Sequence, residues 1–501
     1  MTPQVNVPTL RIAILADLRG RAGREARDLA PPIAPRRLIP VDVDNFERML
    51  ARIEPRLEIR LGDSDSPRLP IVFRRLDDFH PDALHRDMEL FGPLRDIRRR
   101  LLDPSTFAAA AADWSRAVGL TAGAGPTVGP PSPSEPEDDE ATHRRLLGRG
   151  PTGSARAPAS APAGLDRLLR QIVAPHIVPG ADPRLPELLR SVDDTTAALL
   201  RAILHHPDYQ ALESVWRAVH DLVTGIETDG AVEVCLLDVT KAELGDTGAG
   251  DWAPAVERLL NSRDSAHDPA SVWPLLVAAF AFGPGEDDVT LLERLGAIAR
   301  RTGGPVLAAA DPGIVGCRSF AEAPDRRDWS APDAGTAARW RRLRESALAP
   351  WIGLAMPRIL LRLPYGQRTD PIEAFSFEEL SSGRDHEAYL WGNAAFGCAR
   401  LISSSFVENG TAMEPGDHLQ LDDLPTAVYD DDGEPRMKPC AEAALSDVSA
   451  EAILDAGAMP LLASSRRNTV RVMRFQSIAH PPQPLAGPWG PSPSSSSPEE
   501  R

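Results

Sequence analysis

Lysine, aromatic residues and cysteine are all scarce in this sequence. Lys241 and Lys438 are the only lysines among 55 basic residues, and aromatic residues make up 5% of the 501. A core of this chain must therefore rest mainly on Leu, Val, Ile and Ala. No CxxC pair occurs, and nothing in the cysteine spacing indicates a disulfide framework. The cysteines are Cys235, Cys317, Cys398 and Cys440.

Segments that would target the chain or anchor it in a membrane are not expected either. Residues 1–20 contain no basic region followed by an apolar run and a cleavage site, so we expect no signal peptide. The longest apolar stretch, 272–282, is shorter than the ~20 residues that cross a bilayer. The formal net charge of −17 disfavours nucleic acid and anionic membrane surfaces as partners. We therefore expect a soluble cytoplasmic protein that binds neither.

Motifs of the common enzyme classes are missing as well. A nucleotide-binding P-loop needs Gly-Lys-Ser/Thr, and neither lysine follows a glycine. The sequence has no HExxH, GxSxG or SxxK motif. GRGPTG at 148–153 matches a dinucleotide-binding pattern in letters only, because no strand precedes it. We predict that the chain is not an enzyme and has no catalytic residue, cofactor or metal.

Three polar motifs have a functional and a structural interpretation, and we favour the structural one for each. Adjacent histidines in HHPD (205–208) point about 100° apart on a helix, so a helix boundary capped by Asp208 is favoured over a metal site. The carboxylates of AFGPGEDD (281–288) would repel an anion, which favours a capped turn. YDDDGEP (429–435) lacks the ligand spacing of a calcium loop, and its Asp-Gly favours a hairpin.

The first folded part is predicted to be a small α+β domain over residues 1–116. It is expected to hold a buried strand, a helix capped by Asp44, a hairpin of two strands, and a second helix. These elements are placed at 10–18, from 45, at 57–61 with 69–76, and at 81–102. Residues 117–164 are rich in Pro, Gly, Ser and Ala, so we predict a disordered tether.

The second folded part begins at residue 165. A helical region is predicted over 165–224, an α/β domain over 225–482 and a disordered tail over 483–501. Strands are expected at 232–239, 273–282 and 305–310, with a helix at 285–304. Such strand–helix–strand units predict parallel pairing with a right-handed crossover. The expected fold class is thus α/β (α+β), with the small domain docked on the larger one.

Two separate stretches carry a resemblance to a known family. The first resembles the small sheath subunit of bacterial type VI secretion systems (the TssB/VipA family), in ILADL, VDVDNFERMLARIEPRLEIRL and FRRLDDFHPDAL, at 14–18, 41–61 and 73–84. The second resembles the large sheath subunit (the TssC/VipB family), in stretches such as ILHHPDYQALESVWRAVHDLV and DHEAYLWGNAAF. Four stretches in all carry this second resemblance, at 203–223, 305–316, 340–366 and 385–396.

The resemblance implies a structural role and a set of partners. The two subunits ordinarily form a heterodimer whose polymer is a contractile sheath, and its contraction drives an inner tube outward. The implied partners are the chain itself or other sheath subunits, the tube protein, the baseplate and a recycling AAA+ unfoldase. In the family, a short helix near the start of the large subunit is the unfoldase handle. The helix at 165–173 stands in that place, with Leu165, Leu168, Leu169 and Ile172 on its apolar face; packing on its own domain is the alternative.

A candidate interface is predicted at Arg358, Arg362 and Tyr365. The two arginines are four residues apart and are expected to pair either with acidic partners across an interface or with local carboxylates. The large-subunit family continues beyond the equivalent of Phe475 and supplies interlocking strands there, so the large-subunit part is expected to be truncated. We therefore also keep a second hypothesis, a sheath-derived regulator or terminator that binds the machine but cannot polymerise.

Overall fold

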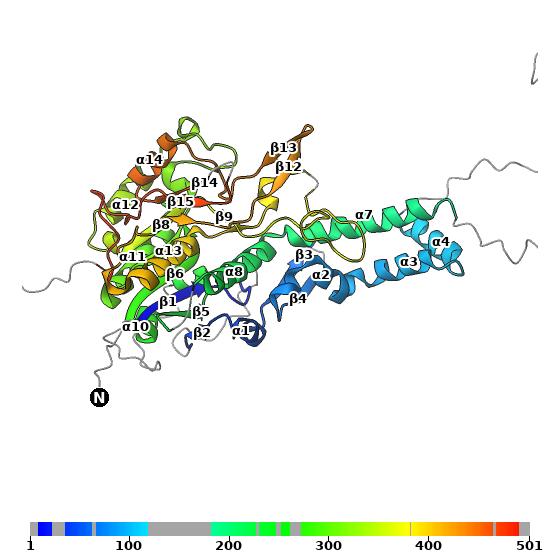
Figure 1. Ribbon diagram of the computed structural model, residues 1–501, viewed down its shortest axis with the longest axis horizontal. Helices are drawn as coiled ribbons and strands as arrows, with labels where there is room; N and C mark the ends of the chain where they lie inside the picture. Colours follow the sequence, from blue (N-terminus) through cyan, green and yellow to red (C-terminus); the bar gives the residue numbers. More distant parts are fainter. Residues whose placement is uncertain are drawn as a thin grey trace, which may run out of the picture. The chain divides into compact units, whose positions relative to one another are not determined.

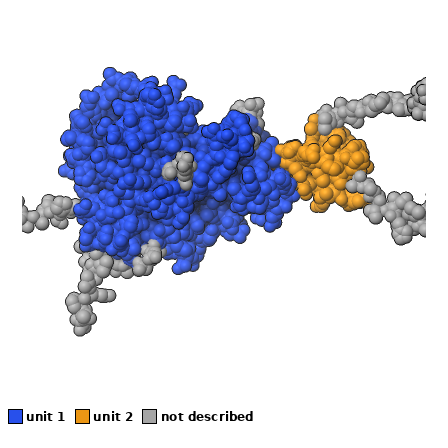
Figure 2. All heavy atoms as spheres, turned by 45° about the horizontal axis from the view of Figure 1, so that its top comes forward, with its two compact units in different colours: residues 1–88, 197–501 blue, residues 89–196 orange. Residues whose placement is uncertain are grey.

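The computed structural model describes the chain in nine stretches and divides it into two compact units. The described residues are 9–22, 36–62, 67–118, 182–226, 230–246, 252–260, 272–380, 382–463 and 467–489. The sheet unit contains Met1–Met88 and Ala197–Arg501, and the helical unit contains Glu89–Thr196 (Figure 2). The predicted tether at 117–164 lies almost wholly outside the described residues.

A nine-stranded sheet forms the centre of the sheet unit (Figure 1). Six neighbouring strands run parallel, and antiparallel strands close both edges. In spatial order the strands are β11 (Gln420–Leu421), β15 (Val470–Val472), β14 (Met459–Ala463), β8 (Ile352–Met356), β7 (Val306–Ala310), β6 (Val272–Phe282), β1 (Thr9–Ala16), β5 (Val232–Asp238) and β2 (Ile39–Val41).

The first strand of the chain lies inside this sheet. All eight residues of β1 are buried, as its continuous apolar run requires of a strand covered on both faces. Ile12 lies opposite Val234 of β5 on one side and opposite Leu275 of β6 on the other. Figure 1 shows dark-blue β1 among strands from far later in the sequence. The parallel core β5-β1-β6-β7-β8 has the order 2-1-3-4-5 in chain order, which is the flavodoxin-like doubly wound arrangement.

Helices cover both faces of the sheet. One large core packs α10 (Ala253–Leu260), α11 (Glu286–Thr302) and α12 (Ala334–Arg344) against alternate residues of β6, β7 and β8. Helix α13 (Ala394–Asn409) contacts the same three strands without a residue in that core, so it covers the opposite face. It contacts α8 (Pro207–Thr224) on that face. Further helices described in this unit are α1 (Phe46–Ile53), α2 (Pro81–Asp87), α9 (Lys241–Gly245) and α14 (Asp447–Asp455).

The α/β prediction is confirmed, and most predicted elements of the sheet unit form. Strands β3 (Arg56–Arg60) and β4 (Arg68–Val72) make the expected hairpin. Helix α11 ends at Gly303, whose φ of 77° suits glycine. The Asp-Gly signal also holds, since β12 (Val428–Asp431) and β13 (Glu434–Met437) pair across Asp432 and Gly433, both with positive φ. The last pair of strands is β9 (Ile359–Leu360) with β10 (Trp391–Gly392).

One helix that was predicted to be continuous is interrupted. The single helix expected at 81–102 is instead α2, a short 3-10 turn and α3 (Gly92–Leu102). Met88 is extended at the end of α2, and a proline stands in the first turn of α3. The boundary between the two compact units falls at the same residue.

The helical unit is built from α3, α4 (Phe107–Ala117) and the first part of α7 (Leu185–Leu204). Its core joins Phe107 and Trp114 of α4 to Val192 of α7. Arg98 of α3 pairs with Asp193 of α7 at 2.8 Å. Residues before 119 and residues after 181 therefore both contribute to the helical unit, as they do to the sheet unit.

Three local predictions need correction. Asn45, not Asp44, is the N-cap residue of α1, and no side chain caps that helix. His206, not Asp208, caps α8, because its ring Nδ1 accepts the Asp208 N–H at 3.3 Å. The segment predicted as a tail without structure begins at 483, yet Leu485 is 3% exposed and the Ala486 N–H donates to the Pro350 carbonyl at 2.7 Å. No helix within the described stretches is both long and apolar enough to cross a membrane.

Candidate functional site

Arg362 is the centre of a buried group of charges. Its guanidinium donates to Glu213 at 2.7 Å and to Glu379 at 2.7 Å, and its side chain is 9% exposed. Arg217 also donates to Glu213 at 2.7 Å. Arg362 lies over the ring of Tyr365, 4.1 Å from its centroid. Two arginines and two glutamates are thus paired in a group whose carboxylates are almost completely buried.

Burial and pairing set the protonation states in this group. Burial alone would raise the pKa of Glu213, but Arg362 and Arg217 outweigh it and hold that pKa below its ordinary value. Burial raises the pKa of the Tyr365 hydroxyl. Burial would lower the pKa of Arg362, but Glu213 and Glu379 raise it well above its usual range. Glu213 and Arg362 are therefore both charged at neutral pH.

Tyr365 also connects this group to the first part of the chain. Its ring meets the ring of His80, edge to face, with centroids 4.8 Å apart. Tyr209 Oη, on α8, donates to the Phe79 carbonyl at 2.8 Å and packs against the stacked rings of Phe73 and Phe79. The predicted residues Arg362 and Tyr365 thus lie where residues before 119 meet residues after 181.

The same two stretches meet through further polar contacts. Trp216 Nε1 donates to the Leu18 carbonyl at 3.1 Å. Arg11, on β1, pairs with Glu233 of β5 at 2.9 Å. Arg36 pairs with Glu243 at 2.6 Å. These arginines precede residue 119 and the carboxylates follow residue 181. The charges of the two stretches are therefore complementary at the junction.

Arg358 belongs to a different cluster. It donates to Glu442 at 2.7 Å and to Glu387 at 2.9 Å, and its side chain is 38% exposed. Burial would raise the pKa of Glu442, but hydrogen bonds from His386 and Arg358 lower it to about 2. Arg358 and Arg362 both pair with carboxylates of this chain, although Glu213 is 149 residues from Arg362 and Glu442 is 84 residues from Arg358. A role of Arg358, Arg362 and Tyr365 between chains stays a prediction.

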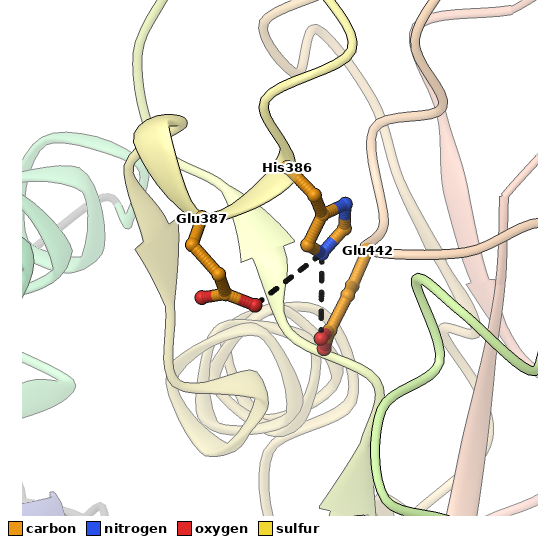
Figure 3. A group of neighbouring side chains, drawn as sticks. All are labelled: His386, Glu387 and Glu442. Atoms are coloured by element: carbon orange, nitrogen blue, oxygen red, sulfur yellow. Dashed lines mark ion pairs between the residues drawn. The ribbon is translucent and has the colours of Figure 1, made fainter.

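His386, Glu387 and Glu442 together have the composition of a metal site (Figure 3). Three of their ligand atoms lie within 4.8 Å of one another. His386 Nε2 points at Glu442 from 3.5 Å and at Glu387 from 4.0 Å, and its ring stacks on Trp391. However, Arg358 already donates to both carboxylates, and a guanidinium there would repel a cation. The geometry favours an ion-pair cluster that ties 386–387 to 442.

The unfoldase handle lies outside the described residues. Leu165, Leu168, Leu169 and Ile172 all fall within 119–181, so the handle stays a prediction.

Comparisons with known proteins place both stretches. Residues 187–479 match a family described as "EvpB/VC_A0108, tail sheath N-terminal domain". Residues 2–114 match a second, described as "Type VI secretion system, VipA, VC_A0107 or Hcp2". The chain belongs to the type VI secretion sheath family. It is a fusion of a TssB-like and a TssC-like part, which confirms the resemblance seen in the sequence.

Two sheath proteins of Pseudomonas aeruginosa are similar to this fused sheath subunit. TssC1 is 33% identical over 313 residues, which is 59% of this chain and 62% of TssC1. TssB1 is 31% identical over 100 residues, which is 19% of this chain and 56% of TssB1. The chain thus spans about three fifths of the length of the curated relatives that it matches.

The contacts described above can now be assigned to the two sheath parts. Leu18, Phe79 and His80 belong to the TssB-like part, while Tyr209, Trp216 and Tyr365 belong to the TssC-like part. The candidate site is therefore the internal junction of the fused subunits. Sequence reasoning missed Glu213 and Glu233 there, since a single carboxylate on a helix or strand carries no signal of a partner 149 or 222 residues away. Trp216 falls within the helical region predicted over 165–224, but its acceptor, the Leu18 carbonyl, could not be identified from the sequence.

Proposed function

We propose that the chain is a fused structural protomer of a type VI secretion sheath, which surrounds an inner tube and drives its ejection. One observation carries this proposal: β1 of the TssB-like part is hydrogen-bonded on both sides, to β5 and β6 of the TssC-like part. Two subunits that share one sheet act as a single building block. That is what a polymer of paired subunits requires.

Covalent fusion strengthens this arrangement. Joining two partners in one chain gives them an effective concentration of order mM, so their association no longer depends on expression level. It also fixes their ratio at one to one. A sheath built from this chain would therefore have no excess of either part.

Electron microscopy of the purified chain, alone and with the cognate tube protein, tests the proposal. We expect filaments or hollow cylinders, with the tube protein increasing their number or order. Particles that stay dispersed under both conditions, at concentrations where tube protein polymerises, would contradict the proposal.

The remaining partners follow from the sheath role. We propose that the assembled chain meets a baseplate and works in the cytoplasm, where a AAA+ unfoldase recycles it. The apolar face of 165–173 is the proposed handle, and Leu168→Asp with Leu169→Asp should abolish retention of the unfoldase in a pull-down. Leu102→Asp is a matched control, because Leu102 is an exposed leucine of the described part. Equal unfoldase retention by both variants would remove the handle from the proposal.

A second candidate function is a sheath-derived regulator or terminator that binds the machine without extending the polymer. It is kept because the model matching 187–479 represents the N-terminal domain of a tail sheath protein. The two candidates differ in one property. A regulator would cap or shorten sheaths formed by separate subunits in the same micrographs and form none by itself.

A further inference from the structure

The tripeptide His-Pro-Asp occurs twice in this chain, once at the start of α2 and once at the start of α8. In both places the histidine is the N-cap residue and the proline is the first helical residue. His80 Nδ1 accepts the Asp82 N–H at 3.1 Å, and His206 Nδ1 accepts the Asp208 N–H at 3.3 Å. The TssB-like part and the TssC-like part thus each begin a helix with an imidazole cap.

A histidine cap works in only one protonation state. The acceptor is the lone pair of Nδ1, which a neutral imidazole has and an imidazolium lacks, because both ring nitrogens of the charged form are donors. The usual N-cap residues, Asn, Asp, Ser and Thr, keep their acceptor between about pH 5 and 8. Imidazole takes up its proton near pH 6.5 in water, that is, at about pH 6.5. Mild acid therefore turns each of these caps from an acceptor into a donor that faces another donor.

The groups around His80 do not replace a lost cap. Its Nδ1 lies 3.7 Å from Asp82 Oδ2, and its Nε2 lies 3.5 Å from Asp370 Oδ1. Nε2 is buried and has no hydrogen-bond partner in the described structure. The Asp370 side chain is 65% exposed, so water screens its attraction for a charged imidazole. The remaining titratable neighbour is the ring of Tyr365, which meets His80 edge to face.

The groups around His206 do not replace its cap either. The carboxylate that faces it is that of Asp208, with Oδ2 3.9 Å from Nδ1. His205 is the next residue along the chain, but its Nε2 lies 3.8 Å from Glu379, so it titrates in different surroundings. A protonated His206 thus gains one distant carboxylate and loses its hydrogen bond to the helix.

The two caps flank one contact between the sheath parts. Tyr209 Oη donates to the Phe79 carbonyl at 2.8 Å. Phe79 directly precedes the first cap, and Tyr209 lies in the first turn of α8, behind the second cap. The N–H groups of a first turn have no acceptor within their own helix, so loss of a cap frays that turn. Fraying of either helix start therefore displaces one partner of this hydrogen bond.

We propose that the contact between α2 and α8 is a proton-sensitive joint, which is closed at neutral pH and loosens below about pH 6.5. The closed joint needs both imidazoles neutral, whereas the unfolded chain takes up protons freely. This part of the stability is therefore complete above that pH and is lost as the pH falls. Strands β1, β5 and β6 contain no histidine, so the shared sheet is not part of the switch. The joint does not depend on polymerisation of the chain.

Hydrogen exchange of the full chain at pH 7.5 and 5.5, resolved to single amides, tests the proposal. Protection is compared after correction for the intrinsic pH dependence of exchange. We expect the Asp82 and Asp208 amides to lose about 5-fold or more of their protection at the lower pH, because loss of an N-cap has an effect of this size.

Two variants test each cap separately. Asparagine is a good N-cap and its side chain does not titrate. His80→Asn should abolish the pH effect at the Asp82 amide and leave the effect at Asp208, and His206→Asn should do the reverse, so each variant is the folding control for the other. His418→Asn removes a histidine from a loop outside both helices and should leave both effects. The proposal is overturned if both amides of the wild type are equally protected at the two pH values, or if both cap variants lose protection as the wild type does.

Discussion

Arg362 forms buried salt bridges with Glu213 and Glu379 at the junction. Taking a charge out of water costs several kcal/mol, which close pairing can offset but seldom exceeds. Such a group mainly favours one packing arrangement, because only that arrangement gives each charge a partner. The spacing of Arg358 and Arg362 made both residues candidates from the sequence. Glu213 could not be predicted as a partner of Arg362, because it is 149 residues away in the chain.

Arg362→Met should destabilise the chain strongly. The substitution keeps much of the side-chain volume but leaves Glu213 and Glu379 without their shared donor, at a cost of about 3–5 kcal/mol. Urea unfolding followed by circular dichroism measures this loss. Arg86→Met is the control, because Arg86 forms an exposed pair with Asp87 and its loss should not move the midpoint. Equal midpoints for the two variants would show that the buried group is not needed for stability.

His205 should make stability depend on pH. Burial lowers its pKa, although nearby Glu379 raises it and Arg362 and Arg201 lower it further. Its folded pKa therefore lies below the unfolded value of about 6.5. The unfolded chain takes up a proton below that pH while the folded chain resists it, so stability is complete above it and falls as pH decreases.

His205→Asn should reduce this pH dependence. We expect a smaller loss of the free energy of unfolding between about pH 7.5 and 5.5 than in the wild type, because one group that distinguishes the two states is removed. Urea titrations at both pH values give the comparison. His220→Asn provides a parallel case, since burial lowers the pKa of His220 as well. An identical loss in wild type and His205→Asn would contradict the assignment.

At the scale of elements, local signals decided what was predictable. Helix α11 carries its acidic start, basic end and terminal glycine in its own sequence, and the β12–β13 turn carries Asp-Gly. The break at Met88 was missed because the apolar pattern continues on both sides of it. The position of β1 within the sheet could not be predicted from the sequence either. Its run of apolar residues predicts a buried strand, but its neighbours begin more than two hundred residues later.

Ile12→Asp should disrupt both sheath parts together. Ile12 is fully buried between β5 and β6, and an unpaired charge there should cost about 4 kcal/mol or more. In hydrogen exchange, we expect the amides of β1, β5 and β6 to lose protection together. Val43→Asp, at an exposed valine of the TssB-like part, should leave all three protected. Loss of protection confined to β1 would mean that the TssB-like part is not integral to the sheet.

At the scale of the whole molecule, neither compact unit consists of one sheath part alone. The sheet unit takes β1 from the TssB-like part, and the helical unit combines α3 and α4 with the first part of α7. The family could be predicted because its motifs are continuous in sequence. The sharing of one sheet could not, because parallel pairing between distant strands leaves no local mark.

A protease site inserted between residues 119 and 181 offers the most direct measurement of this claim. After cleavage, the account predicts that the two fragments elute together from a sizing column and separate only in denaturant, because β1 is bonded on both sides within the sheet. Fragments that separate without denaturant would contradict the shared sheet, and with it the single building block.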